Sequence, residues 1–198
     1  MVSDPIILGA VIMVSLTSTF ILIGKDWRYC ILALSLQYIG VFILVDTSWP
    51  VEMAVAKMVA GWMSGAILGI AMASIPPAWR ASDKSVKFGP FFRVLAAIIL
   101  ILTISSLVLR SDSWLSMISN PIRWGSFILI SFGILQLSLN SHPLRIIIGL
   151  LTSLSGFEIL YAAIETSTLV TGLLAGVNLG LALVGAYLLV APAMESNP

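Results

Sequence analysis

The residues best able to do chemistry are a few polar side chains inside long apolar stretches. Glu158 follows the charge-free stretch 146–157, which places its carboxylate about 18 Å into a helix that rises 1.5 Å per residue. Lys57 lies five residues after Glu52, near the start of another apolar run, and Asn178 is close to the middle of a third. Ionisable groups inside membrane helices usually face protein or water and often mark an ion path. We interpret Glu158, Lys57 and Asn178 as candidates for such a path.

Ser155 and Glu165 complete the set of candidates. Ser155 precedes Glu158 by about one helical turn and is placed to hydrogen-bond it, while Glu165 follows by two turns on the same face. Apolar surroundings disfavour the charged form of a carboxyl group, so that it can gain and lose a proton near neutral pH. Glu165 would then form the outer end of a path that begins at Glu158.

Each candidate also has a structural interpretation, which the sequence leaves open. Glu158 could be a protonated carboxyl that hydrogen-bonds a neighbouring helix. Lys57 could extend its side chain to the membrane interface. Asn178 could join two helices through a hydrogen bond, as most such asparagines do.

No signature of a soluble enzyme accompanies these residues. The sequence has no phosphate-binding loop, no Gly-x-Ser-x-Gly and no cluster of cysteines and histidines, since His142 and Cys30 are its only residues of these types. We therefore expect no catalytic residue, no cofactor and no metal site. The net charge of +1 gives no basic surface for nucleic acid.

The composition indicates that a lipid bilayer surrounds these residues. Charged residues make up 10% of the chain and hydrophobic ones 59%, whereas a soluble domain carries roughly 25% charged residues. A spanning helix needs about 20 mostly apolar residues. Such runs, ended by charges or prolines, predict an all-α, polytopic membrane protein of about seven spans: 5–24, 29–45, 51–75, 91–109, 122–139, 144–165 and 166–190.

Loop charges predict the orientation. The side that holds the C-terminus receives seven basic residues: Lys25, Arg28, Arg80, Lys84, Lys87, Arg93 and Arg145. The other side receives three: Lys57, Arg110 and Arg123. Because basic residues concentrate on the cytoplasmic side, we expect a cytoplasmic C-terminus and an outside N-terminus. Separately, we expect the membrane to be a prokaryotic-type inner (plasma) membrane.

The third and seventh spans indicate an internal duplication. Residues 58–65 align with 173–180, and both segments contain Ala-Gly-x-x-x-Gly, a spacing that lets helix backbones approach closely. The register continues until Pro77 meets Pro192. We predict one membrane domain, 1–198, with a parallel repeat of three-helix units at about 5–77 and 122–192 and a connector helix at about 91–109. Coincidence between apolar segments rich in glycine and alanine is the alternative.

Two segments resemble a known family. Residues 143–150, Pro-Leu-Arg-Ile-Ile-Ile-Gly-Leu, are similar to the second helix of the small K-type membrane subunit of respiratory complex I. Residues 176–183, Gly-Val-Asn-Leu-Gly-Leu-Ala-Leu, resemble that subunit's third helix. The C-type component of multisubunit sodium/proton antiporters is related to it. The length and layout of the whole chain resemble membrane component E of hydrogenase-4 complexes, which carries a lysine in a setting similar to that of Lys57.

The resemblance is convincing over about a quarter of the chain, and its glutamates are displaced. The K-type subunit has a glutamate in each of its last two helices, and the matching positions here are Leu151 and Gly176. The glutamate of component E would fall near Leu154. Glu158 lies two turns from Leu151 on nearly the same face, so the resemblance does not transfer the family's role to it residue by residue.

The resemblance implies a non-catalytic membrane subunit of an ion-translocating complex. Such a subunit would contribute to proton or sodium translocation, or to assembly with larger antiporter-like membrane subunits within the bilayer. A stand-alone secondary transporter built from the repeat is one alternative. A purely structural spacer subunit is the other.

Overall fold

The computed structural model describes residues 4–76, 89–111 and 115–195 and is all-α. The described residues form seven helices: α1 (Asp4–Ile23), α2 (Trp27–Asp46), α3 (Val51–Ser74), α5 (Pro90–Ser111), α6 (Asn120–Leu139), α7 (Pro143–Ala162) and α8 (Thr168–Glu195). Each contains a stretch long and apolar enough to cross a membrane. The predicted fold class is confirmed. The basic residues at 80, 84 and 87, on which part of the orientation depends, lie outside the described residues.

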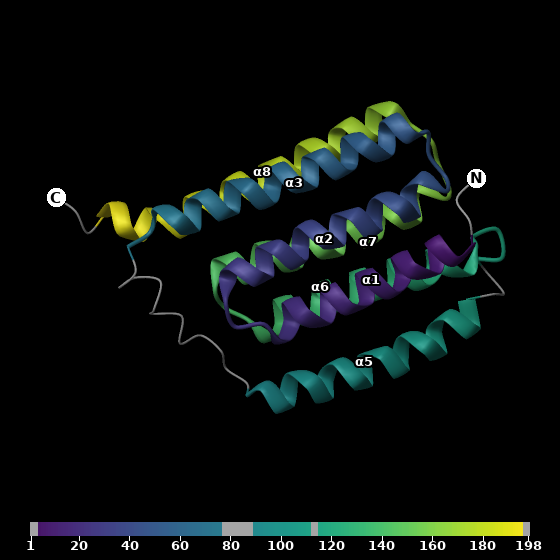
Figure 1. The fold of residues 1–198 in the computed structure, drawn as a ribbon, viewed down its shortest axis with the longest axis horizontal. Helices are drawn as coiled ribbons and strands as arrows, with labels where there is room; N and C mark the ends of the chain where they lie inside the picture. Colours follow the sequence, from purple (N-terminus) through teal and green to yellow (C-terminus); the bar gives the residue numbers. More distant parts are fainter. Residues whose placement is uncertain (1–3, 77–88, 112–114, 196–198) are drawn as a thin grey trace.

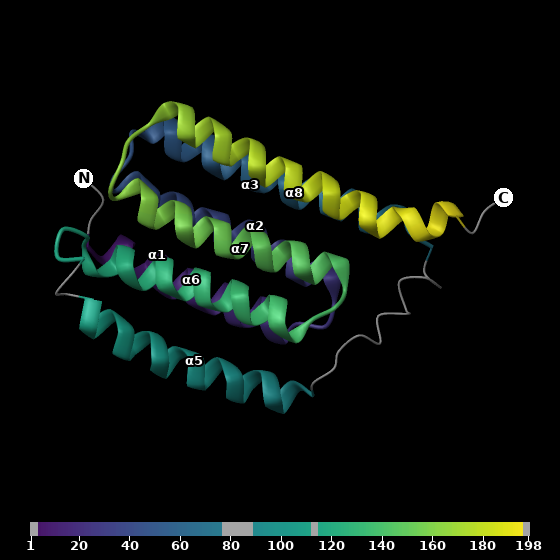
Figure 2. The same cartoon turned by 180° about the vertical axis from the view of Figure 1, so that it is seen from behind.

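Six of the seven described helices form two layers of three. One layer contains α1, α2 and α3, and the other contains α6, α7 and α8 (Figures 1 and 2). Across the layers α1 packs against α6, α2 against α7 and α3 against α8, and the members of each pair run in the same direction (Figure 1). The layers contain the helices of the two predicted repeat units, and α5 lies at the edge beside α1 and α6. The duplication itself stays a prediction.

Short turns at the two ends of the bundle join α1 to α2, α2 to α3, α6 to α7 and α7 to α8. We call the end where α1 meets α2 the Lys25 end, and the end where α2 meets α3 the Trp49 end. At the Lys25 end the Asp26 side chain accepts a hydrogen bond from the Arg28 N–H at 3.0 Å. At the Trp49 end the Trp49 indole Nε1–H donates to the carbonyl oxygen of Glu165 at 2.8 Å. This second contact joins the turn before α3 to the turn before α8.

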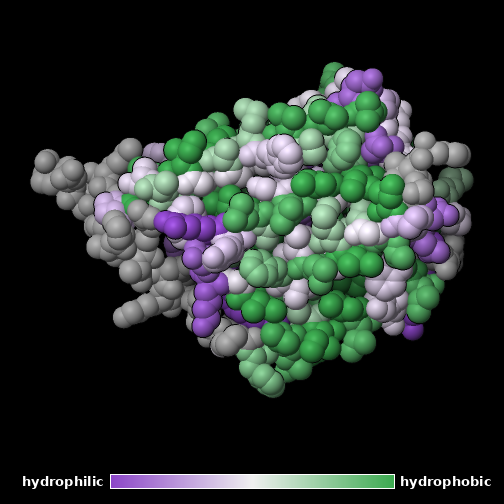
Figure 3. Space-filling model, in the orientation of Figure 1, coloured by the Kyte–Doolittle hydropathy of each residue, from purple (hydrophilic) through white to green (hydrophobic). Residues whose placement is uncertain are grey.

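The outside of the bundle is apolar along its middle. Figure 3 shows hydrophobic residues over the central part of one face and hydrophilic residues gathered at both ends. Large apolar side chains are exposed in the middle parts of the helices, among them Leu16, Leu102, Ile134 and Leu183. Contact between these side chains and water would be unfavourable, whereas their contact with the apolar chains of lipid carries no such cost. The chain is therefore an integral membrane protein. The kind of membrane and the orientation stay predictions.

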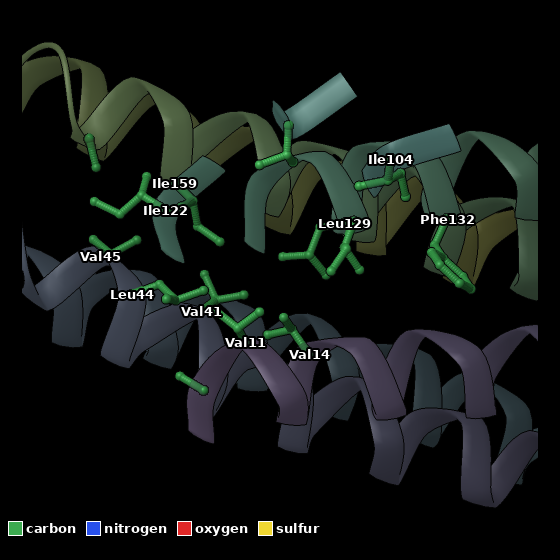
Figure 4. Close-up of a cluster of buried hydrophobic side chains, with 14 of the residues drawn as sticks. Val11, Val14, Val41, Leu44, Val45, Ile104, Ile122, Leu129, Phe132 and Ile159 are labelled. Carbon is green, nitrogen blue, oxygen red and sulfur yellow. The ribbon is translucent and has the colours of Figure 1, made fainter. Parts of the chain in front are cut away.

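Two apolar clusters form the core. The first lies mainly between α1, α2, α5 and α6 and includes Val14, Val41, Leu129 and Phe132 (Figure 4). The second lies between α2, α3, α7 and α8 toward the Lys25 end and includes Leu34, Leu68, Ile148 and Leu151. The space between these four helices toward the Trp49 end holds a buried lysine and a buried glutamate.

Candidate functional site

Lys57 and Glu158 form an ion pair between the two layers. Lys57 extends from α3 and is 2% exposed, and Glu158 extends from α7 and is 1% exposed. The Lys57 ammonium Nζ contacts the Glu158 carboxylate oxygen Oε2. The structural interpretation, in which Lys57 extends to the membrane interface, is therefore wrong. Burial of the ammonium away from water is costly, and the attraction of the Glu158 carboxylate offsets this cost.

Asn178 and Tyr38 extend the ion pair into a network across four helices. The amide Nδ2 of Asn178, on α8, donates to Glu158 Oε1 at 3.2 Å. The hydroxyl of Tyr38, on α2, donates to the Asn178 amide oxygen Oδ1 at 3.4 Å. The ring of the same tyrosine lies with its centroid 5.1 Å from Lys57 Nζ, a distance at which an aromatic face attracts a cation. We call Lys57, Glu158, Asn178 and Tyr38 the polar network.

Small residues on α3 give the network its geometry. Gly61 lies under the Tyr38 ring, and a Cβ at this position would overlap the ring atoms. Ser64 hydrogen-bonds the backbone oxygen of Asn178 at 3.2 Å and that of Ala60 at 2.8 Å. The predicted Ala-Gly-x-x-x-Gly motif of the third span thus serves a contact inside the chain. At the equivalent Gly176 and Gly180 of α8, a Cβ would meet no atom of the described residues within 4 Å.

The network lies closer to the Trp49 end than the sequence indicates. Glu158 is four residues from Ala162, the last residue of α7, so about 6 Å of helix separates it from that end. Lys57 lies six residues into α3, about 9 Å from the same end. The predicted span 144–165 is therefore too long at its end. The chain turns at Ala163, and the N–H groups of Ile164 and Glu165 donate to the Tyr161 carbonyl oxygen.

The two remaining candidates, Ser155 and Glu165, are not placed as the sequence predicts. Ser155 is buried beside the network, but its hydroxyl donates to the Leu151 carbonyl oxygen at 2.9 Å, one turn earlier in α7. Glu165 lies in the turn after α7 and is exposed. Because the helix ends before it, Glu165 does not share a helical face with Glu158. The structure brings together Glu158, Lys57 and Asn178, with Ser155 next to them.

Sequence reasoning missed Tyr38. Its phenol lies in the apolar run of the second span, where the surrounding residues give no sign that the hydroxyl has a partner. A buried tyrosine hydroxyl usually has a hydrogen-bond partner, which is the signal that could have found it. The matching partner, Asn178, is remote in sequence and comes close only through the packing of the layers.

The network can hold and exchange protons without a cofactor. With the proton on Lys57 the pair is an ammonium and a carboxylate, and with the proton on Glu158 both groups are neutral. Both states have zero net charge, so proton exchange within the pair leaves the charge of the buried site unchanged. Addition of another proton leaves an uncompensated positive charge, which a low-dielectric interior strongly disfavours. Among the described residues, no group of three or more His, Cys, Asp or Glu side chains is placed to hold a metal ion.

Comparison with known proteins gives no further assignment. No family model, no curated protein and no solved structure matches this chain.

Proposed function

We propose that the chain is a non-catalytic membrane subunit of an ion-translocating complex, of the complex I, hydrogenase-4 or multisubunit antiporter kind. The observation that carries the proposal is the Lys57–Glu158 pair, buried between two layers of membrane-spanning helices. Intramembrane ionisable residues are costly and commonly serve ion paths. The parent complex and the larger antiporter-like partner subunits rest on the sequence resemblance alone.

The proposed ion is the proton. Lys57 already contacts the Glu158 carboxylate, and Asn178 donates to its second oxygen. A sodium ion would have to displace the lysine to reach this carboxylate, whereas a proton binds to either group. A proton that enters the pair creates a net positive charge, so its arrival favours the release of another proton. The pair would then act as a relay step within a longer path through the complex.

Two alternatives remain, each with its own support. The parallel pairing of α1, α2 and α3 with α6, α7 and α8 around a buried polar site is also the layout of secondary transporters built from repeats. A stand-alone transporter is the second candidate. A structural spacer is the third, because an ion pair across the layers would also fix how they pack.

The substitution Glu158→Gln tests the proposal in the purified complex. Glutamine keeps the volume of the side chain and an oxygen that accepts a hydrogen bond, but it does not bind and release a proton. We expect the complex to assemble and its proton translocation into vesicles, followed with a pH-sensitive dye, to fall several-fold. Glu52→Gln is the matched control, because the same change occurs at an exposed carboxylate outside the network. An assembled Glu158→Gln complex that pumps at the wild-type rate favours the spacer.

Cysteine labelling tests the proposed orientation. Cys30 is the only cysteine of the sequence and is buried, so it gives little background. Ser116 is exposed in the turn between α5 and α6, and Ser141 is exposed in the turn between α6 and α7 at the opposite end of the bundle. A membrane-impermeant thiol reagent added outside cells should label Ser116→Cys and spare Ser141→Cys. The reverse pattern would show that the N-terminus is cytoplasmic.

A further inference from the structure

Four buried polar side chains between the layers have atoms without a hydrogen-bond partner among the described residues. They are Ser18 on α1, Gln37 on α2, Gln136 on α6 and Thr152 on α7, and each is at most 2% exposed. The partnerless atoms are Ser18 Oγ, both amide atoms of Gln37, Gln136 Nε2 and Thr152 Oγ1. Buried polar groups are nearly always hydrogen-bonded, and water is the usual partner where protein supplies none.

Other buried hydroxyl groups of the chain do have hydrogen-bond partners, so burial alone does not explain why Ser18 and Thr152 have none. Ser64, Ser126 and Ser155 each donate to a backbone carbonyl oxygen three or four residues earlier in their own helix. Such bonds satisfy a hydroxyl inside a helix without any neighbour. Ser18 and Thr152 have no bond of this kind. Their hydroxyls are therefore available to a ligand between the layers.

The four side chains follow one another along the bundle. Thr152 lies six residues before Glu158 in α7, about 9 Å nearer the Lys25 end, and Ser155 lies between them. Gln37 precedes Tyr38 of the network in α2 and is itself buried. From the network toward the Lys25 end, the next buried polar residues are thus Ser155 and Thr152 on α7 and Gln37 on α2.

Packing of α1 against α2 brings Ser18 to the level of Gln37. A Cβ at Gly40 would meet Val14, Met13 and the Ala10 carbonyl oxygen, so residues 10–14 lie opposite residue 40. The two helices are antiparallel, and one turn further residues 14–18 lie opposite residues 36–37.

The polar positions continue from Ser18 to the Lys25 end. Gln136 lies three residues from the end of α6 at Leu139, about 5 Å from that end. Its backbone oxygen accepts a hydrogen bond from Asn140 Nδ2 at 2.8 Å. The Asn140 amide oxygen accepts from Arg93 at 2.6 Å. Buried polar groups thus extend from the ion pair to the opposite end of the bundle.

The chemistry of these groups fits water. Each hydroxyl both donates and accepts, and the Gln37 amide offers two N–H donors and one acceptor oxygen. A bare cation needs acceptors only and would be repelled by the amide hydrogens. Water needs both kinds of partner and commonly makes about three hydrogen bonds when buried.

We propose that Ser18, Gln37, Gln136 and Thr152 bind a file of water molecules between the layers, which connects the Lys57–Glu158 pair to the Lys25 end. The pair lies about two turns or less from the Trp49 end, so the longer half of a path across the membrane has to pass this region. The role of the file as a proton path rests on the function proposed above, whereas the binding of water does not.

Radiolytic labelling of the full chain in lipid nanodiscs, in water enriched in ¹⁸O, tests the file. Hydroxyl radicals formed from bound water oxidise neighbouring side chains even where bulk solvent does not reach. Tyr38 is 1% exposed and adjoins Gln37, which makes it the reporter. We expect the label on Tyr38 in the wild type. The double variant Gln37→Leu, Thr152→Val should lower it at least several-fold.

Ser126→Ala is the matched control, because Ser126 is equally buried but its hydroxyl already donates to the Arg123 carbonyl oxygen at 3.1 Å. This variant should leave the labelling of Tyr38 unchanged. Unlabelled Tyr38 in the wild type, or equal labelling in the wild type and the double variant, would overturn the proposal.

The outcomes separate this inference from the proposed function. Labelled Tyr38 together with normal pumping by the Glu158→Gln complex would keep the water file and reject the proton relay. Unlabelled Tyr38 together with a pumping defect in Glu158→Gln would keep the relay and reject the file.

Discussion

The buried arginines of the Lys25 end and the ion pair between the layers differ in their partners. At the Lys25 end the Arg93 guanidinium donates to the Leu22 carbonyl oxygen at 2.7 Å and to the Asn140 amide oxygen at 2.6 Å. Arg145 donates to the Gly24 carbonyl oxygen at 2.7 Å. Between the layers, Lys57 instead contacts the Glu158 carboxylate.

The difference separates fixed charges from exchangeable ones. An arginine does not lose its proton in a protein, and the carbonyl oxygens at the end of α1 are neutral acceptors that carry the negative end of the helix dipole. Arg93 and Arg145 therefore hold α5 and α7 to the end of α1 in one charge state. The side chains of lysine and glutamate, in contrast, each have a charged and a neutral form. The arginines thus suit a fixed connection, and the Lys57–Glu158 pair suits the proton exchange that we propose.

Removal of one member of the ion pair should have the largest effect on stability. Lys57→Met leaves the Glu158 carboxylate buried without its counter-charge, which should destabilise the fold by about 3–5 kcal/mol. The double variant Lys57→Met, Glu158→Met should recover most of this loss, because well-packed apolar residues replace both charges. Thermal unfolding of the purified protein, followed by fluorescence-detected size exclusion, measures both. A double variant no more stable than the single one would show that the two side chains are not coupled.

Removal of an arginine at the Lys25 end should lower stability by a smaller amount, and no second substitution should restore it. Arg145→Ala leaves the Gly24 carbonyl oxygen without its charged donor, and hydrogen bonds to charged groups contribute about 1.5–3 kcal/mol. The same unfolding assay measures this loss. Arg28→Ala, at an exposed arginine of the same end, is the control and should change stability by less than about 0.5 kcal/mol. Equal effects of the two alanines would argue against the role of Arg145 as a fixed connection.

Disturbed packing beside the ion pair should have the third-largest effect on stability. Gly61→Ala places a methyl group against the Tyr38 ring, and overpacking of this kind costs about 1–3 kcal/mol. Gly176→Ala, at the equivalent position of α8, meets no neighbouring atom of the described residues. It should leave stability unchanged or raise it by less than about 1 kcal/mol, because alanine favours a helix. Unfolding temperatures of the two variants give the comparison, and an equal loss in both would mean that α3 and α8 do not differ in this way.

The helices could be predicted because each depends on a local signal. A run of apolar residues bounded by charges, Pro50 or Pro143 marks a span, and most of its boundaries agree with the structure to within two residues. One exception is the end of α8, because this span was predicted to end at residue 190 and the helix instead continues through Pro192 to Glu195. The other is the end of α7. The turn there is joined to Trp49 of another loop through the Glu165 carbonyl oxygen, and no neighbouring residue in the sequence reveals this contact. Because the predicted helix was too long, Glu165 was wrongly placed on the same helical face as Glu158.

The site could be predicted in its members but not in its arrangement. Glu158, Lys57 and Asn178 attract notice because charged and amide groups are rare in apolar runs. Their meeting depends on the rotation of α3, α7 and α8 and on how the layers pack, to which the sequence gives no direct access. Tyr38 was missed for the same reason, since only its contact with Asn178 distinguishes it from an ordinary core aromatic residue.

Proton translocation by the double variant Lys57→Met, Glu158→Met tests the central claim most directly. The substitution removes both exchangeable protons and, by the stability argument above, preserves assembly, so a loss of transport would not result from misfolding. The purified complex in vesicles with an internal pH-sensitive dye should assemble fully and translocate protons several-fold more slowly than the wild type. An assembled double variant that pumps at the wild-type rate would contradict the claim and would make the Lys57–Glu158 pair a purely structural contact between the layers.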